Sequence, residues 1–297
     1  MPNQAQLDQI AKGPGFIAAL DQSGGSTPKA LKLYGIEEDA YSSEDQMYDL
    51  IHEMRSRIAM APDFTGEKVI GAILFEKTMN REINGKPAGH YLWEESQVVP
   101  FLKVDKGLEE EVDGAKLMKP IDGLDDLLKS AVQAQMFGTK MRSVIEAANP
   151  AGIAANVAQQ FEIGRQILSH GLVPILEPEI NINMANKADA EAMLVDEISK
   201  QLDMLKPGED IMLKLTLPET ANQYKPLVDH DRVVRVVALS GGYVRDEANT
   251  RLSQNAGVIA SFSRALTEGL SAQQDDDAFH AHLAKTIDSI YRASVAG

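Results

Sequence analysis

The sequence predicts a single-domain (β/α)8 TIM barrel, and three observations support that fold class. Eight short, β-rich apolar runs recur with starts 23 to 53 residues apart, which leaves room in each interval for a helix and two loops. The runs are apolar throughout rather than alternating, as expected of parallel strands covered on both faces. The length of 297 residues also fits one barrel, which typically takes about 250 residues.

The elements follow in order along the chain. The predicted strands are FIAAL from Phe16, VIGAILF from Val69, VVPFLKV from Val98, FGTKMR from Phe137, LVPILEPEI from Leu172, DIMLKLTL from Asp210, VVRVVAL from Val233 and VIASFS from Val258. Apolar residues spaced three and four apart predict helices in the segments that start at Ser42, Leu124, Asn156 and Ala188. The final segment, QDDDAFHAHLAKTIDSIYRASVAG, is also expected to be helical, since its acidic start favours the helix dipole.

No linker rich in Pro, Gly or Ser divides the chain, so residues 1–297 are expected to form one domain. A six-stranded doubly wound sheet with extra strands is the alternative topology. The interval between residues 21 and 68 is long, and we expect it to hold a loop and one long helix.

Composition and charge exclude several classes of function. The formal net charge is -15 and no run of Lys or Arg is present, which argues against binding to nucleic acid or to anionic membranes. No apolar stretch approaches 18 residues and no signal peptide is apparent, so a cytoplasmic protein is expected. The absence of cysteine excludes disulfides, thiolate zinc sites and cysteine nucleophiles.

Charged residues stand late in five of the predicted strands. Residues two apart in a strand share a face, and the charged positions are Asp21, Lys103 with Asp105, Lys140 with Arg142, Glu177 with Glu179, and Lys214. One such lysine alone is more often a residue at a sheet edge or one that reaches solvent. Five strand ends that carry charge at equivalent positions instead predict an active site at the carboxyl-end mouth of the barrel.

Two later loops suggest an anion site at the same mouth. LSGGY, from Leu239, follows the seventh strand, and FSRAL, from Phe262, follows the eighth. A Gly-Gly turn and an arginine at these positions supply backbone N–H groups, a hydroxyl and a guanidinium where barrels commonly hold phosphate. Taken alone, the Gly-Gly pair could equally be a tight turn. The six histidines avoid the strand ends, so no metal site and no cofactor are expected.

The ordered set FIAALDQS, FLKVDKG, FGTKMR, VPILEPEI, MLKLTLP, VALSGGY and FSRAL resembles class I fructose-1,6-bisphosphate aldolase, in particular the shorter bacterial type. The resemblance extends from about Gly13 to Leu266. It implies a Schiff-base enzyme of glycolysis and gluconeogenesis that needs no metal. Such an enzyme reversibly cleaves fructose 1,6-bisphosphate to dihydroxyacetone phosphate and glyceraldehyde 3-phosphate.

The resemblance also implies roles for individual residues. Lys214 looks like the Schiff-base lysine, Glu177 like the acid/base that removes water from the carbinolamine, and Lys140 like the lysine that assists it. Asp21 resembles the aspartate that takes the C4 hydroxyl proton, and Glu179 the glutamate that orders this network. The implied phosphate groups are Ser240, Gly241, Gly242 and Arg264 for the C1-phosphate, and Lys103, Arg142, Ser23 and Ser26 for the C6-phosphate end.

The sequence departs from the family in three places. Gln22 stands where many eukaryotic members have glutamate, and Lys29-Ala30 keeps only half of a basic pair. Tyr291 is not expected to replace the terminal tyrosine of those members. The alternatives are another Schiff-base sugar-phosphate aldolase or transaldolase, a metal-dependent sugar-phosphate enzyme, or a non-enzymatic scaffold.

Overall fold

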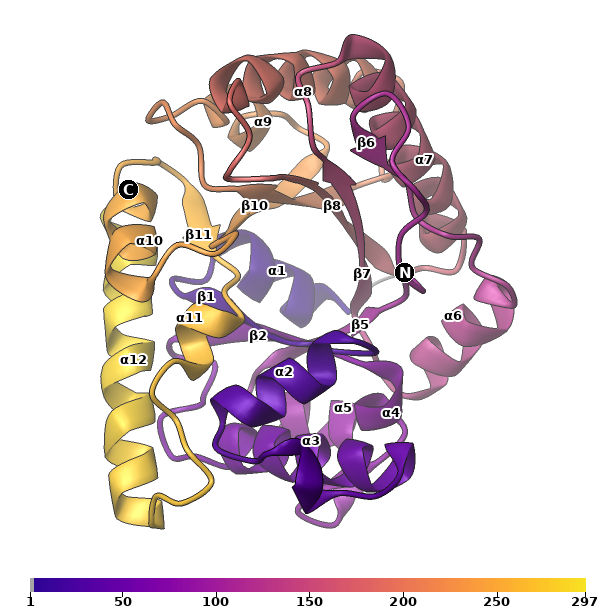
Figure 1. Ribbon diagram of the computed structural model, residues 1–297. Helices are drawn as coiled ribbons and strands as arrows, with labels where there is room; N and C mark the ends of the chain where they lie inside the picture. Colours follow the sequence, from indigo (N-terminus) through magenta and orange to yellow (C-terminus); the bar gives the residue numbers. More distant parts are fainter. Residues whose placement is uncertain (1–2) are drawn as a thin grey trace.

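A computed structural model describes residues 3–297, and its central sheet is a barrel of eight parallel strands in sequence order (Figure 1). The strands are β1 (Phe16–Leu20), β2 (Val69–Leu74), β5 (Val99–Lys103), β7 (Gly138–Ile145), β8 (Val173–Ile180), β9 (Ile211–Thr216), β10 (Val233–Leu239) and β11 (Val258–Ala260). The predicted fold class is confirmed, since every predicted run forms a strand. The doubly wound alternative is wrong.

The ring is joined between its first and last strands. The backbone N–H of Ala19 in β1 donates to the carbonyl of Phe262, just after β11, at 3.1 Å. The remaining neighbours pair in parallel, from β1 with β2 round to β10 with β11. The carboxyl ends of all eight strands therefore lie at one end of the barrel.

Helices surround this ring. They are α2 (Ser26–Leu33), α3 (Glu44–Ala59), α4 (Glu76–Met79), α5 (Ala88–His90), α6 (Leu124–Gln133), α7 (Pro150–Ser169), α8 (Lys187–Leu202), α9 (Lys225–Val228), α10 (Arg245–Leu252), α11 (Arg264–Thr267) and α12 (Asp276–Ala296). Smaller elements are the 3-10 helix η1 (Glu38–Ala40), the π-helix η2 (Tyr91–Glu95), the hairpin of β3 (Glu82–Ile83) with β4 (Lys86–Pro87), and β6 (Ala115–Lys116), which pairs antiparallel with β7. The five predicted helices are present.

Local sequence sets the helix starts. α7 begins at Pro150, six residues before the predicted start, because the Asn149 side chain accepts from the backbone N–H groups of Ala151 and Gly152 and proline suits the first helical position. α3 begins after Ser43, whose side chain accepts from the Gln46 N–H. The interval after β1 holds two helices, α2 and α3, rather than the one we expected.

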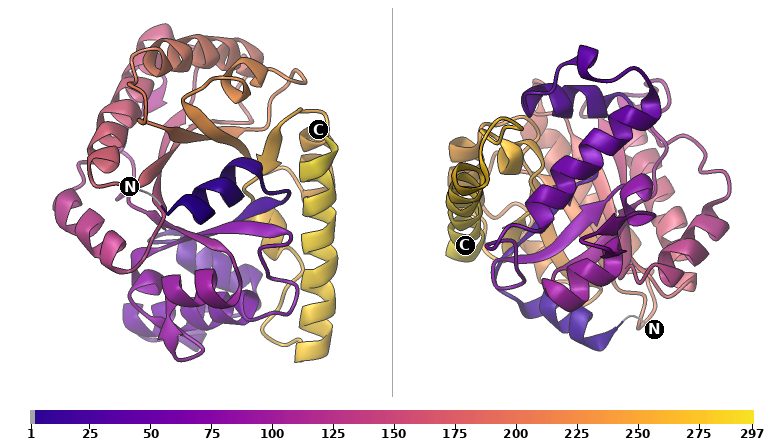
Figure 2. Two further views of the ribbon diagram at one scale, coloured as in Figure 1. Left: turned by 180° about the vertical axis from the view of Figure 1, so that it is seen from behind. Right: turned by 90° about the horizontal axis from the view of Figure 1, so that it is seen from below.

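The helix α1 (Gln4–Lys12) closes the amino end of the barrel, and it was not predicted. Figure 2, seen from behind, shows α1 lying across that end. Ile10 is fully buried there, and Arg235 donates to the carbonyls of Ile10 and Gly13 at 2.9 and 3.1 Å. Gln9 donates to the carbonyl of Ile70 at 3.0 Å, which fixes the helix to β2.

Apolar side chains fill the barrel above α1. The inner cluster consists of Ile10, Ile17, Ala19, Ile70, Ile73, Val99, Phe101, Phe137, Val173, Ile175, Met212, Val237 and Ile259. A larger apolar layer lies between the strands and the surrounding helices. The inner cluster forms a buried apolar layer at the amino end of the barrel. Polar groups further along the same strand faces therefore lie toward the carboxyl-end mouth.

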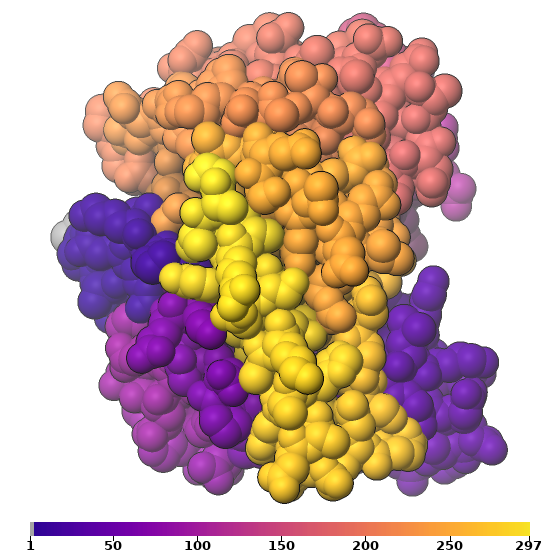
Figure 3. Space-filling view, turned by 90° about the vertical axis from the view of Figure 1, so that its left-hand side faces the viewer, coloured from indigo at the N-terminus to yellow at the C-terminus, as the bar shows by residue number. Residues whose placement is uncertain are grey.

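The last helix covers one side of the barrel, and Figure 3 shows it in yellow along that face. Arg245 of α10 donates to Thr286 of α12 at 2.9 Å, and Asn249 to Ser289 at 2.7 Å. Within the described residues, none of the helices combines the length and the apolar composition that a membrane span requires.

Candidate active site

Six charged side chains gather directly above the inner cluster. This central cluster consists of Asp21, Lys103, Asp105, Lys140, Glu177 and Lys214, and all but Lys103 are buried. Most of them follow an inner-cluster residue by two positions, or by four for Asp105, so the strand period places the charge on the inward face. Lys140 follows Gly138 by two positions, and Gly138 lies against the ring of the inner-cluster residue Phe101. The structure therefore brings these six residues together at the mouth. Three ammonium groups face three carboxylates, which leaves the cluster formally neutral.

Lys140 of β7 lies at the centre of this cluster. Its Nζ is 2.6 Å from Asp21 Oδ2, 2.9 Å from Glu177 Oε2 and 3.9 Å from Asp105 Oδ2. Its register partner across the sheet is Lys103 of β5, whose Nζ pairs with Asp105 Oδ1 at 2.8 Å. The like charges of the two lysines are thus separated by carboxylates rather than facing each other.

Lys214 of β9 is buried but paired, which explains how a lysine is accommodated in an apolar strand. Its Nζ lies 3.0 Å from Glu177 Oε1. The ladder between β8 and β9 covers two residue pairs and ends at Leu176 and Leu213, directly before these two side chains. One carboxylate, Glu177, therefore contacts two lysines, and it is placed to exchange a proton with either amine.

The surroundings hold these groups in their charged forms. Burial alone would raise the pKa of Asp21, but Lys140 and Lys214 outweigh it and hold that pKa well below its ordinary value. Burial would also raise the pKa of Glu177, but the same two lysines outweigh burial and lower that pKa. Burial disfavours the Lys140 ammonium, but Asp21, Glu177 and Asp105 raise the pKa of Lys140 above its usual range.

We expect the folded chain to lose stability on acidification below about pH 4.5. The pKa values of Asp21 and Glu177 are depressed from 3.8 and 4.5, so the unfolded chain binds protons first, and their contribution vanishes as pH falls through the folded values. Thermal midpoints measured between about pH 3 and 7 should show this slope. Asp21→Asn should make it shallower, whereas Asp8→Asn, which removes an exposed pair with Lys12 that solvent screens, should change it much less. An equally steep slope in Asp21→Asn would count against the assignment.

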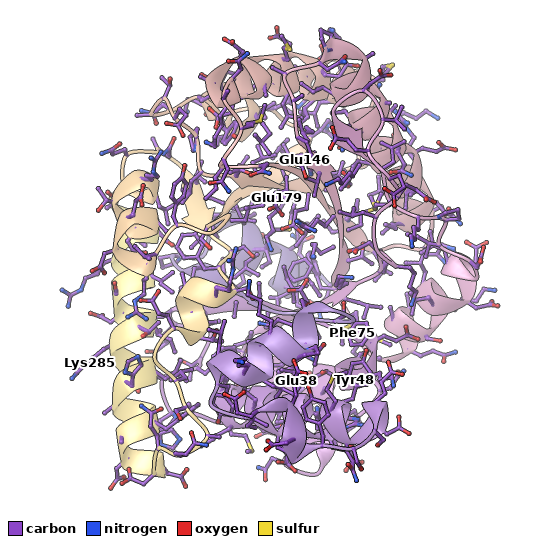
Figure 4. All side chains as sticks on the ribbon, viewed as in Figure 1. Glu38, Tyr48, Phe75, Glu146, Glu179 and Lys285 are labelled. Carbon is purple, nitrogen blue, oxygen red and sulfur yellow. The ribbon has the colours of Figure 1, made fainter. Side chains whose placement is uncertain are left out.

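Arg142 and Glu179 form a second pair, one step further out. Arg142 Nε lies 2.5 Å from Glu179 Oε2, and the Arg142 backbone N–H donates to Asp105 Oδ2 at 3.2 Å. Burial would lower the pKa of Arg142, but Glu179 and Glu177 outweigh burial and raise that pKa. Figure 4 labels Glu179 and Glu146 close together at the mouth. Glu179 thus connects to the central cluster through Arg142 and Asp105.

The Gly-Gly loop and Arg264 also come together. Gly241 has φ of 61° and Gly242 has φ of 126°, values that favour glycine. A Cβ on Gly242 would lie 3.5 Å from the guanidinium of Arg264 and 3.3 Å from Ile182. Ser240, just before the glycines, is buried. A bare backbone with an arginine beside it is able to hold an anion.

The loop after β1 contains Ser23 and Ser26, which bond to each other. The Ser26 hydroxyl donates to the Ser23 carbonyl at 2.8 Å and accepts from the Ser23 N–H at 3.0 Å. Within residues 3–297, no hydrogen bond or ion pair joins either serine to Lys103 or Arg142. The four residues implied for the C6-phosphate end therefore do not form one contact group.

Two features of the site were missed or left unused by the sequence reasoning. Asp105 was recognised as a charged residue at a strand end, yet its contacts with Lys103, Lys140 and Arg142 depend on strand register. Arg55 of α3, which is 1% exposed, was read only as part of an amphipathic helix.

Tyr291 lies far from the site. Its ring is 5.9 Å from the Nζ of Lys68, a residue just before β2 and hence at the end opposite the mouth. In residues 3–297, no group of three or more His, Asp or Glu side chains is arranged to hold a metal ion.

Comparison with known proteins gives consistent matches. The family model for fructose-bisphosphate aldolase class-I matches residues 4–201. The chain is 59% identical over 294 residues to fructose-bisphosphate aldolase class 1 of Synechocystis sp., covering 99% of this chain and 98% of that protein. It is 56% identical over 293 residues to the protein of the same description from Porphyromonas gingivalis, covering 99% of each.

Solved structures agree on the fold. A fructose-bisphosphate aldolase from Plasmodium falciparum, solved in complex with TRAP and a small-molecule inhibitor, superposes with a TM-score of 0.78 at 20% identity. That match covers 100% of this chain and 96% of the other. The protein Cgl0159 of Corynebacterium glutamicum superposes with a TM-score of 0.58 at 14% identity, covering 98% and 92% of the two chains.

Proposed function

The chain belongs to the class I fructose-bisphosphate aldolases, the Schiff-base lyases that cleave fructose 1,6-bisphosphate without a metal ion, and from this we propose that Lys214 forms the imine. The observation that carries the proposal is the unbroken contact series Lys214, Glu177, Lys140 and Asp21, with separations of 3.0, 2.9 and 2.6 Å. It puts a nucleophile, an acid/base and a second base within one buried cluster.

Imine formation needs a neutral amine and a proton donor in turn. Glu177 takes a proton from Lys214, and the free amine attacks the C2 carbonyl of the open-chain ketose. A proton passes from the attacking nitrogen to the former carbonyl oxygen and gives the neutral carbinolamine. Glu177 then returns its proton to the departing hydroxyl, so that water leaves and a protonated imine remains. Lys140 stabilises the Glu177 carboxylate before the first transfer and after the last, and Glu179 orders Arg142 at the edge of the cluster.

Bond cleavage uses the imine as an electron acceptor. Asp21 takes the proton from the C4 hydroxyl, the C4–O electrons form the aldehyde, and the C3–C4 bonding pair moves into the imine to give an enamine on Lys214. The low pKa of Asp21 keeps this carboxylate ionised at neutral pH. Glyceraldehyde 3-phosphate is the first fragment. Dihydroxyacetone phosphate follows after C3 is protonated and the imine is hydrolysed.

The phosphates anchor the two ends of the substrate. We propose that Ser240, Gly241, Gly242 and Arg264 hold the C1-phosphate through backbone N–H groups and a guanidinium. Lys103, Arg142, Ser23 and Ser26 are proposed for the C6-phosphate end. A fixed C1-phosphate places C2 near Lys214, because the Gly-Gly loop follows the adjacent strand β10.

The proposed ligand of this site is a sugar phosphate. The proposed location of the protein is the cytoplasm. The net charge of -15 argues against nucleic-acid or anionic membrane partners. The positive groups at the mouth nonetheless suit an anionic substrate.

Borohydride trapping tests the imine directly. Incubation with fructose 1,6-bisphosphate and borohydride should add one reduced substrate fragment to the intact mass, and peptide mapping should place it on Lys214. Turnover should persist in a strong chelator. If the chain turned over substrate without a trapped adduct, or if the adduct mapped to another lysine, the assignment of Lys214 would be wrong.

A further inference from the structure

The buried arginine Arg55 of α3 has no function in the steps above. It is 1% exposed, and its hydrogen bonds end on neutral oxygens. One NH2 group donates to Thr78 Oγ1 at 2.7 Å and the other to the carbonyl and side-chain oxygens of Gln22, while Nε has no partner. No ion pair joins it to a carboxylate within residues 3–297. A charge buried in this way is costly.

The contacts of Arg55 reach the residue directly after Asp21. Gln22 follows Asp21 in the loop after β1, and its backbone carbonyl accepts a hydrogen bond from Arg55. The Gln22 side chain in turn donates to Ser263 Oγ at 2.8 Å. Thr78 lies in α4, after β2. The guanidinium therefore links α3 and the chain beyond β1 and β2.

Beyond Gln22, the loop is open at its glycines and bonds within itself. A Cβ placed on Gly24 or Gly25 would meet nothing within 4 Å, and Ser23 and Ser26 bond to each other. Asp21 follows the last residue of β1, Leu20. Lys140 contacts the Asp21 carboxylate on one side, and Arg55 contacts the next backbone carbonyl along the chain.

We propose that Arg55 is a positioning residue that fixes Asp21 in line for proton transfer by holding the Gln22 carbonyl. The inference rests on the proposed role of Asp21 as the base for the C4 hydroxyl. It differs from a purely structural role because it concerns C3–C4 cleavage and leaves imine formation by Lys214 and Glu177 intact. It also gives a reason to keep a buried guanidinium that no carboxylate neutralises.

Arg55 keeps its charge at neutral pH, and the carboxylate of Asp21 favours that charge. Burial lowers the pKa of Arg55 to about 10, with Asp21 and Tyr48 opposing. Tyr48 stacks on Phe75 with ring centroids 5.8 Å apart. Figure 4 labels both residues, on the α3 side of the molecule.

The test compares two arginines on one helix. In Arg55→Met, kcat for fructose 1,6-bisphosphate cleavage should fall by about 10- to 100-fold, the range expected when a reacting group is misplaced, while KM changes little. The borohydride adduct on Lys214 should still form. Arg57→Met is the matched control. Arg57 bonds Asp276 and Gln274 and covers Phe279, so its loss should lower stability and leave kcat unchanged.

A double-mutant cycle separates positioning from folding. If Arg55 acts through Asp21, then Arg55→Met should cause no further loss of kcat in an Asp21→Ala background. A loss of the same factor in both backgrounds, or an unchanged kcat in Arg55→Met, would overturn the inference. Should Arg55→Met fail to fold, Arg55→Lys is used in the same cycle, with a smaller loss expected because a lysine is able to reach the Gln22 carbonyl alone. Failure of the parent chain to trap on Lys214 would instead contradict the proposed catalytic roles.

Discussion

Replacing Lys214 by arginine should reduce turnover by a factor of about 10³ or more, because the proposed nucleophile is removed. Arginine retains a positive charge beside Glu177, so the ion pair that now spans 3.0 Å has a substitute. A guanidinium stays protonated at every working pH and forms no imine. The measurement is the steady-state cleavage rate together with borohydride trapping, and both should be lost.

The matched control for this variant is Lys187→Arg. Lys187 is as deeply buried as Lys214, each being 4% exposed, and it pairs with Glu191 and donates to the Leu217 carbonyl at 2.7 Å. It lies at the start of α8, outside the central cluster. Lys187→Arg should keep turnover and the adduct even if it unfolds at a lower temperature. Appreciable activity in Lys214→Arg would instead assign the lysine an electrostatic role.

Lys140→Met should cause the largest combined loss of activity and stability. It removes the cation between Asp21 and Glu177 and leaves buried carboxylates without their closest partner. Breaking a buried ion pair from one side typically costs about 3 to 5 kcal/mol. The free energy of unfolding, measured by urea titration at neutral pH, should fall by about that amount.

The pH dependence of Lys140→Met provides the sharper test. Burial is already the largest single influence on the pKa of Asp21 and of Glu177. Without Lys140 it is opposed mainly by Lys214, and we expect it to raise both pKa values rather than to be outweighed. The folded chain then binds protons more readily than the unfolded chain, so the variant should gain stability as pH falls from 7 to about 5, opposite to the parent chain. Lys103→Met, which frees one carboxylate at the edge of the cluster, should show a smaller effect. The same acid-labile profile in Lys140→Met as in the parent would contradict this account.

The barrel could be predicted because its strands have a composition that short sequence segments already show. Parallel strands covered on both faces are apolar throughout, and a strand's period of two carries the inward face from Val173 and Ile175 to Glu177. The same period carries Met212 to Lys214. Which lysine meets which carboxylate depends on register between strands far apart in the sequence, such as Lys103 opposite Lys140, and this could not be obtained from either segment.

The burial of individual helical residues was harder to predict from the sequence. Arg55 and Arg57 lie two apart in one amphipathic segment, and neither its composition nor its spacing distinguishes them. Positions two apart on a helix point about 200° apart, so one faces the barrel and the other faces α12. Lys187 similarly resembles a surface residue in a helical first turn, yet it is buried. The side that a helix presents is fixed by the strands beneath it.

The helix α1 was missed because its role exists only once the barrel is closed. Its nine residues are polar apart from a few positions; Ile10 enters the inner cluster and Leu7 packs against it. Two apolar side chains three positions apart do not distinguish a helix that closes the barrel from a loosely attached terminal helix.

The closed amino end has a consequence for the traffic of molecules through the enzyme. With α1 and the inner cluster occupying that end, substrate enters and both products depart by the same opening. If the three-carbon fragment is attached to Lys214 as proposed, it cannot leave before hydrolysis, so the aldehyde departs first, and the proton and the water that release the ketose arrive through the same opening. A barrel with one entrance and one covalently held fragment thereby imposes an order on product departure.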